Sequence, residues 1–117
     1  MTVKRIVANI AAENLGAANA FYGEILGLRV VMDHGWIRTF VDEALAAPQI
    51  SFATQGGSGT PVPDLSIEVD DVEEIRQRVV ARGLKIEYGP ANEPWGVRRF
   101  FVRDPFGRLV NILSHEE

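Results

Sequence analysis

Few residues of this chain have side chains suited to chemistry, and the carboxylates near its middle stand out first. Asp64 and Glu68 alternate with apolar residues, so both face the same side of a predicted strand. Two residues four positions apart on a strand are separated by roughly 13 Å. Asp64 and Glu68 are thus too far apart for a tight acid pair or for shared binding of one small metal ion. The alternatives are that Asp64 caps the segment after Pro63 and that Glu68 lies in solvent.

A histidine and a tryptophan form a second group. His34 stands close to Trp36 at a predicted turn, Asp33-His34-Gly35, where Gly provides the positive φ of a tight hairpin. From such a turn an imidazole could act as a base, a ligand contact or a metal ligand. The alternative is an exposed turn residue. The other histidine, His115, is predicted to be a solvated tail residue.

A third group follows a segment rich in Gly and Pro, residues 89–96, which we interpret as a lid. Trp95 could stack on a flat ligand, and Arg98 or Arg99 could meet an anionic group, because guanidinium pairs with carboxylates in a fork. The alternatives are that Trp95 covers a core edge and that the arginines bind Asp104 or another surface acid.

The composition excludes several classes of protein. A net charge of −4 argues against a nucleic-acid surface, which needs clustered Lys and Arg. The absence of cysteine excludes disulfides, thiolate metal sites and a cysteine nucleophile, and suits a reducing cytoplasm. No signal peptide or membrane-spanning run is predicted, so we expect a cytoplasmic protein with no membrane or nucleic-acid partner.

The elements that must position these residues occur twice. In each half a strand precedes a helix that begins at a capping residue, Asn14 or Asp71, and ends at a glycine, Gly27 or Gly83. Three short strands then follow in each half. The predicted strands lie at 3–11, 28–32, 36–41 and 49–54 in the first half, and at 64–69, 84–88, 97–102 and 108–113 in the second.

This repetition predicts a duplicated βαβββ unit. Module one spans about residues 1–54, a Gly- and Pro-rich connector about 55–63 and module two about 64–117, all within one domain. In module two, Val72, Ile75 and Val79 form the predicted buried stripe of the helix. The aromatic residues are assigned to core and module-interface packing: Phe21, Tyr22, Phe40, Phe52, Phe100, Phe101 and Phe106.

Four segments carry a resemblance over nearly the whole chain: Asn14-Leu15, residues 21–28, residues 65–72 and residues 98–110. Together and in this order they resemble the vicinal oxygen chelate superfamily, which includes glyoxalase I, extradiol dioxygenases and bleomycin-resistance proteins. The resemblance implies an α+β fold of two tandem βαβββ modules, which form a curved, cup-like mixed sheet with the helices on the outer face. It also implies a homodimer.

The family's enzymes usually hold a divalent metal by side chains on the first and last strands of each module. The resemblance places Val7, Ser51, Asp64 and Asn111 at those positions. One carboxylate and two neutral oxygens are a poor set for Zn, Ni or Fe, which favour imidazole together with carboxylate. Asn9 shares the parity of Val7, so its amide needs a partner, which a ligand or water could provide.

These observations favour a protein that binds a small organic ligand in the cup without a required cofactor, as the antibiotic-sequestering members do. An alternative is a lyase, isomerase or dioxygenase whose divalent metal is held by Asp64 with His34 or Glu68. Another is an interaction module whose cup is filled by its own side chains. The predicted ligand-binding residues are Asn9, His34, Trp36, Asp64, Trp95, Arg98 and Asn111.

Overall fold

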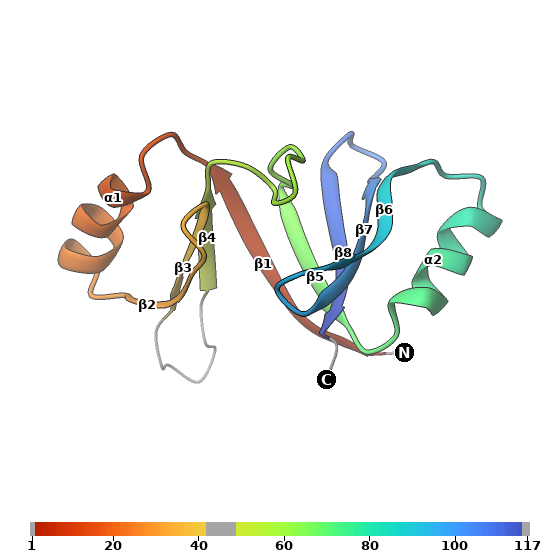
Figure 1. Ribbon diagram of the computed structural model, residues 1–117, viewed down its shortest axis with the longest axis horizontal. Coiled ribbons are helices and arrows are strands. Elements are labelled where there is room, and N and C mark those ends of the chain that lie inside the picture. Colours follow the sequence, from red (N-terminus) through yellow and green to blue (C-terminus); the bar gives the residue numbers. More distant parts are fainter. Residues whose placement is uncertain (1, 42–48, 116–117) are drawn as a thin grey trace. The chain divides into compact units, whose positions relative to one another are not determined.

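The computed structural model describes residues 2–41 and 49–115. These form two compact units. Figure 1 colours one from red to yellow-green and the other from green to blue, except for the first residues of the chain, which belong to the second unit and are red. One unit is Val7–Val62, and the other joins Met1–Ile6 to Pro63–Glu117. Within the described residues, no helix has both the length and the apolar character to cross a membrane.

The first unit pairs its strands in the order β2-β3-β4-β1. β1 runs parallel to β4, and the β4–β3 and β3–β2 pairs are antiparallel. A helical segment of two parts, α1 and η1, follows β1. The elements are β1 (Val3–Ala11), α1 (Leu15–Ala18), η1 (Asn19–Ile25), β2 (Arg29–Asp33), β3 (Ile37–Val41) and β4 (Gln49–Ala53). The residues of β1 up to Ile6 belong to the other unit.

The second unit repeats this topology, with strand order β5-β8-β7-β6. β5 runs parallel to β8, and the other two pairs are antiparallel. Both units are therefore βαβββ modules with mixed sheets, which confirms the predicted α+β duplication. The elements are β5 (Leu65–Val69), α2 (Val72–Ala81), β6 (Ile86–Glu93), β7 (Val97–Arg103) and β8 (Leu109–His115).

Each helix covers one face of its own sheet, because apolar residues alternate with polar ones along the strands. In the second unit Val72, Ile75 and Val79 of α2 pack with Phe100 and other strand residues, which confirms the predicted stripe. In the first unit Leu15 and Ala18 pack with Phe40 and Phe52. The buried core of each unit thus lies between its sheet and its helix.

The strand registers support the predicted equivalence of the two modules. Asn9 of β1 lies opposite Ser51 of β4, and Ser66 of β5 lies opposite Asn111 of β8. The next residues on the fourth strands, Phe52 and Ile112, both pack on the helix side. Ser51 and Asn111 are therefore equivalent, and each module carries an Asn–Ser cross-strand pair with the two residue types exchanged.

The two helices begin differently. The Asp71 Oδ1 atom accepts a hydrogen bond from the Glu74 N–H at 3.2 Å, as the predicted capping pattern requires. Asn14 stands at the N-cap position of the first helix, as predicted, but its side chain makes no capping bond. The first helix also turns into a π-helix after Ala18. Gly27 and Gly83 end the two helices with φ of 77° and 74°, as predicted.

The predicted lid over residues 89–96 was wrong for most of its length. β6 continues through this segment to Glu93, and only residues 94–96 form a turn. Its ladder with β7 shifts register between Tyr88 and Ala91, where Gly89 has φ of 82°. Pro90 is tolerated because it lies at this irregularity in the last strand of its sheet, where a missing N–H costs little.

The aromatic residues were mostly assigned correctly to the core. Phe40, Phe52, Phe100 and Phe101 are buried, whereas Phe21 is 50% exposed. Phe106 is 87% exposed, so it does not pack in the core of its unit, contrary to the prediction. It lies in the turn between β7 and β8, where the Asp104 carboxylate accepts from the N–H groups of Phe106 and Arg108.

Candidate functional site

The polar side chains of the second unit gather on the sheet face that points away from α2, called the distal face below. Alternation along β7 sends Phe100 and Val102 toward α2 and therefore Arg99 and Phe101 to the distal face. The register with β8 puts Asn111 opposite Phe101. The distal face includes Ser66, Glu68, Tyr88, Glu93, Arg99, Phe101, Asn111 and Leu113.

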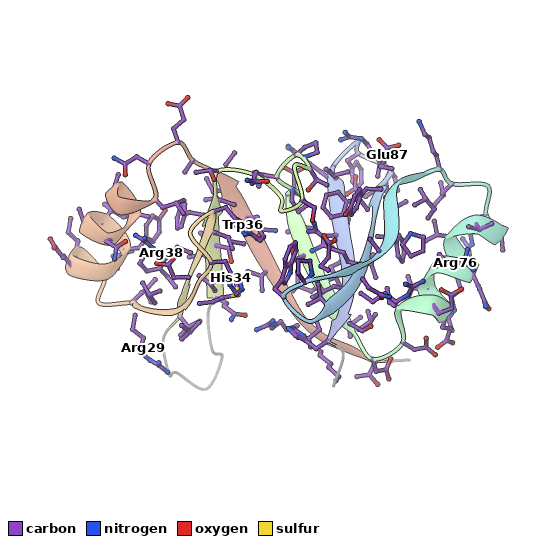
Figure 2. All side chains as sticks on the ribbon, in the orientation of Figure 1. Arg29, His34, Trp36, Arg38, Arg76 and Glu87 are labelled. Atoms are coloured by element: carbon purple, nitrogen blue, oxygen red, sulfur yellow. The ribbon has the colours of Figure 1, made fainter. Side chains whose placement is uncertain are left out.

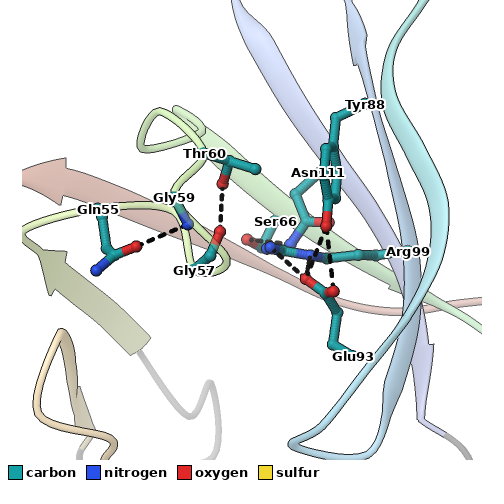
Figure 3. A network of polar contacts seen from close by, with 9 residues as sticks. All are labelled: Gln55, Gly57, Gly59, Thr60, Ser66, Tyr88, Glu93, Arg99 and Asn111. Carbon is teal, nitrogen blue, oxygen red and sulfur yellow. Dashed lines mark hydrogen bonds and ion pairs between the residues drawn. The ribbon is translucent and has the colours of Figure 1, made fainter.

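A buried ion pair lies at the centre of this face (Figure 3). The Arg99 Nη2 atom is 2.6 Å from Glu93 Oε2, and the two side chains are only 3% and 5% exposed. The Arg99 Nε–H donates to the same oxygen at 2.9 Å, and the Tyr88 hydroxyl donates to Glu93 Oε1 at 3.1 Å. The carboxylate is thus held from two sides, and the two charges cancel.

Three aromatic rings surround the Arg99 guanidinium. Its Cζ atom lies 5.4 Å from the ring centroid of Tyr88, 5.0 Å from that of Trp95 and 4.8 Å from that of Phe101. All three distances fall within the range of cation–π attraction. Trp95 is therefore brought to the distal face, and the guanidinium is fixed by rings as well as by its carboxylate.

Asn111 lies on the same face with an incompletely satisfied amide. Its Nδ2 atom donates to the Ser66 hydroxyl at 3.1 Å. Its Oδ1 atom is shielded from solvent and has no hydrogen-bond partner among the described residues. Buried polar atoms are nearly always paired, since an unpaired one costs about 1–3 kcal/mol. This oxygen is the clearest unused binding group of the unit.

Glu68 occupies the distal face near the chain ends of this unit. Its carboxylate pairs with Arg5 of β1 at 3.0 Å and lies 2.7 Å from the Nδ1 atom of His115. The Glu68 side chain is 14% exposed, so it does not lie in solvent. His115 is exposed, as predicted, but it contacts Glu68. The carboxylate joins the first residues of β1 to the last of β8.

Asp64 lies just before β5 and is used by the backbone. Its Oδ2 atom accepts from the Leu109 N–H at 3.0 Å, and its own N–H donates to the Leu109 carbonyl at 2.8 Å. The Arg108 guanidinium is 3.9 Å from its other oxygen. These contacts match the alternative in which Asp64 caps the connector.

Arg98 lies on the opposite side of the sheet from Asn111, because it shares the parity of Phe100. Its Nη1 atom donates to Asn92 Oδ1 at 3.0 Å. The pKa of Glu73 on α2 is lowered mainly by the hydrogen bond from Arg76 and, to a smaller extent, by the charge of Arg98. The structure therefore associates Arg98 with the helix and separates it from the distal face.

The other three predicted site residues belong to the first unit. His34 and Trp36, labelled in Figure 2, stack with centroids 6.1 Å apart at the β2–β3 turn. The Asp33 carboxylate orders this turn by accepting a hydrogen bond from the Gly35 N–H at 2.9 Å. This bond, together with the nearby Arg38, lowers the pKa of Asp33. Asn9 is half-buried in β1.

The residues at the positions that hold metal in the resembled family do not suit a transition metal. Val7 is apolar, the Ser51 hydroxyl is 2.7 Å from the Thr39 hydroxyl, and the Asp64 carboxylate already accepts from a backbone N–H. Asn111 adds one neutral oxygen. Among residues 2–41 and 49–115, no cluster of three or more His, Cys, Asp or Glu side chains could hold a metal ion.

Sequence reasoning did not identify the residues that form the centre of the distal face. The sequence offers Arg98 and Arg99 as alternatives, and the parity of β7 separates the two, since Phe100 and Val102 have the pattern of core residues. Glu93 and Tyr88 had no such signal. Glu93 reaches Arg99 because β6 continues past Gly89 and Pro90, where the sequence indicated a loop, whereas Tyr88 is the last residue of the predicted strand 84–88.

A sequence model of the Glyoxalase/Bleomycin resistance protein/Dioxygenase superfamily matches residues 3–112. No curated protein sequence matches. Solved structures do: one described as the NAD-dependent benzaldehyde dehydrogenase from Legionella pneumophila has a TM-score of 0.75 at 18% identity, over 96% of this chain and 100% of that one.

Two methylmalonyl-CoA epimerases are also similar. The Mycobacterium tuberculosis structure has a TM-score of 0.69 at 19% identity, over 98% of this chain and 90% of that one. The Streptomyces coelicolor structure, a complex with 2-nitronate-propionyl-CoA, has a TM-score of 0.69 at 19% identity, over 99% and 100%. At such low identity these similarities concern the fold alone.

Proposed function

Since this chain belongs to the Glyoxalase/Bleomycin resistance protein/Dioxygenase superfamily, we propose that it binds a small organic molecule and requires no metal to do so. The observation that carries this proposal is the buried Asn111 Oδ1 atom, which lacks a donor among the described residues. A ligand donor would satisfy it, and the aromatic and charged groups around Arg99 would orient the ligand.

The proposed contacts on the distal face are Asn111 and Trp95, with Asp64 at its edge. Asn111 would orient the ligand through its amide, and Trp95 would offer part of its ring surface beside Arg99. Asn9, His34 and Trp36 remain proposed contacts in the first unit. Arg98 is not included, because its side chain belongs to the α2 side of the sheet.

The metal-free character is proposed from the donor set. A metal site built from Asp64 with His34 or Glu68 would need carboxylates that already have partners. Asp64 accepts from the Leu109 N–H, and Glu68 pairs with Arg5. The rival function, a metal-dependent lyase, isomerase or dioxygenase, is tested by elemental analysis of protein purified without an affinity tag. Stoichiometric Zn, Ni, Mn or Fe that disappears in Asp64→Ala would refute the metal-free proposal and favour the rival.

Ligand binding itself is tested by thermal-shift screening of metabolites and drugs. The screen is run on chelator-treated protein and again with added divalent metals. The proposal predicts compounds that raise the melting temperature of the chelator-treated protein, because a ligand that binds only the folded state stabilises it. It fails if no compound stabilises either preparation, or if all stabilisation requires metal.

We also propose a cytoplasmic homodimer. β1 supports association of two copies, because Val3, Ile6 and Ile10 are 47%, 58% and 42% exposed along this strand. Light scattering should then give twice the chain mass of 12.9 kDa, and Ile6→Lys should reduce it to the monomer. The cytoplasmic location is supported by the absence of cysteine.

A further inference from the structure

The chemistry of Asn111 restricts what a ligand can present to it. Because Asn111 lies opposite Ser66 on β5 and Phe101 on β7, its side chain is central to the distal face. One amide hydrogen is used by Ser66, and the residue is 7% exposed. One hydrogen on Nδ2 and the Oδ1 lone pairs are left for a ligand.

The Ser66 hydroxyl bonds only one end of the Asn111 amide. Because this hydroxyl can donate as well as accept, it could pair with Oδ1 if the amide were turned over, and Nδ2 would then point away from Ser66. In either orientation Ser66 satisfies one end of the amide alone. An incoming group that both donates and accepts satisfies the amide in both orientations.

The charges on the distal face are already balanced. Arg99 is paired with Glu93 at 2.6 Å, and Glu68 is paired with Arg5 at 3.0 Å. An ionised ligand group buried here would have to compete with one of these partners or remain unpaired, and a buried unpaired charge is costly. Neutral groups avoid this cost.

We infer that the ligand group recognised by Asn111 is an uncharged amide or lactam, which offers one N–H and one C=O to the matching pair on the side chain. This inference rests on the proposed function, since it concerns the same face. The Asn111 Oδ1 atom is shielded from solvent. The ligand therefore reaches it only when the groups that cover this atom move.

Three probes with the same ring test the inference: benzamide, benzoate and benzamidine, which are neutral, anionic and cationic. Binding is followed by NMR through the Asn111 side-chain amide and the backbone N–H groups of Ser66 and Phe101. Benzamide should shift these signals saturably, and the two charged probes should bind about tenfold more weakly or worse. The matched variant Asn111→Asp should no longer bind benzamide and should bind benzamidine, because the substitution replaces the amide by a negatively charged acceptor.

Asn111→Leu controls for a fold defect in the Asp variant. This variant should bind neither benzamide nor benzamidine, while the NMR signals of α2 stay unchanged. The inference is overturned if benzoate or benzamidine binds the wild-type face as well as benzamide does, or if benzamide binding survives Asn111→Leu. It is also overturned if none of the probes shifts these signals. The proposed function would survive any of these results as long as some compound stabilises the protein in the thermal screen.

Discussion

Arg99 and Glu93 form an ion pair with 2.6 Å between Nη2 and Oε2, on side chains that are almost completely buried. The pair joins β7 to the end of β6, six residues earlier in the chain. Removal of charges from water is expensive, so such a pair is retained only where each partner is fully compensated. The Tyr88 hydroxyl compensates Glu93, and the rings of Tyr88, Trp95 and Phe101 compensate Arg99.

Arg99→Ala should lower the free energy of unfolding by about 3–5 kcal/mol, because it leaves Glu93 as a buried charge without its partner. Urea denaturation measures this change. The control is Arg103→Ala on the same strand, whose pair with Glu87 at 3.3 Å is partly exposed. The control should cost no more than about 1 kcal/mol. Equal costs for the two variants would contradict the role assigned to the buried pair.

Asn111→Leu should raise the free energy of unfolding by about 1 kcal/mol and abolish the ligand response. Leucine has the same branched shape as asparagine, with bulkier terminal groups, and removes the unpaired oxygen; stabilising changes at binding sites commonly cost function. Chemical denaturation and the thermal screen measure the two effects. Asn92→Leu, at an exposed position of β6, should change stability by less than about 0.5 kcal/mol and leave ligand binding intact. A destabilised Asn111→Leu that still binds would refute this view of the site.

Gly89→Ala should destabilise the protein more than Gly96→Ala does. Both glycines have positive φ, 82° and 89°, so both variants suffer the same backbone strain. Only at Gly89 would a Cβ meet the backbone, 2.6 Å from the Arg99 carbonyl oxygen, whereas nothing lies within 4 Å at Gly96. The difference in unfolding free energy, about 1–3 kcal/mol, isolates the close approach of β6 to β7. Equal effects would mean that the two strands separate easily there.

The acid stability of the protein should depend on Asp70. The Thr2 N–H donates to its carboxylate at 2.9 Å, and this bond is the main cause of a pKa below the ordinary value of 3.8. Because the pKa is lowered in the folded state, the stabilisation is present above pH 3.8 and is lost as pH falls through the lower folded value. Asp70→Asn should remove this part of the pH dependence, measured by denaturation from neutral to acid pH.

Glu24→Gln makes the same change in charge at an exposed helical residue and controls for net charge. Its pH profile should keep the shape of the wild-type curve. Identical acid limbs in wild type and Asp70→Asn would show that the bond from Thr2 does not couple to folding. Hydrogen exchange at the Thr2 and Asp70 backbone amides would then show whether the start of β1 separates from Asp70 in solution.

The fold could be predicted from sequence because its signals are local and repeated. The alternation at 65–69, the cap at Asp71 and the glycines after both helices each fix an element within a few residues. Two such sets in the same order lead to the duplicated topology. The start of the first helix was less predictable from local signals. Asn14 has the right type and place for a cap but makes no capping bond, while Leu15 and Ala18 pack in the core.

The site was harder to predict because it depends on contacts between strands. Asn111 and Ser66 face each other through a parallel register that no local pattern specifies. Glu93 meets Arg99 only because β6 continues beyond Pro90, a residue that normally indicates the end of a strand. Strand parity carries usable information, however, and it separates Arg98 from Arg99 without coordinates.

The most direct test of the account is isothermal titration of the best compound from the thermal screen into chelator-treated wild type and Asn111→Leu. Stoichiometric binding to the chelator-treated wild type and none to the variant is the predicted result. Binding that appears only after a divalent metal is added, or that is equally tight in both proteins, would contradict a metal-free site built around Asn111.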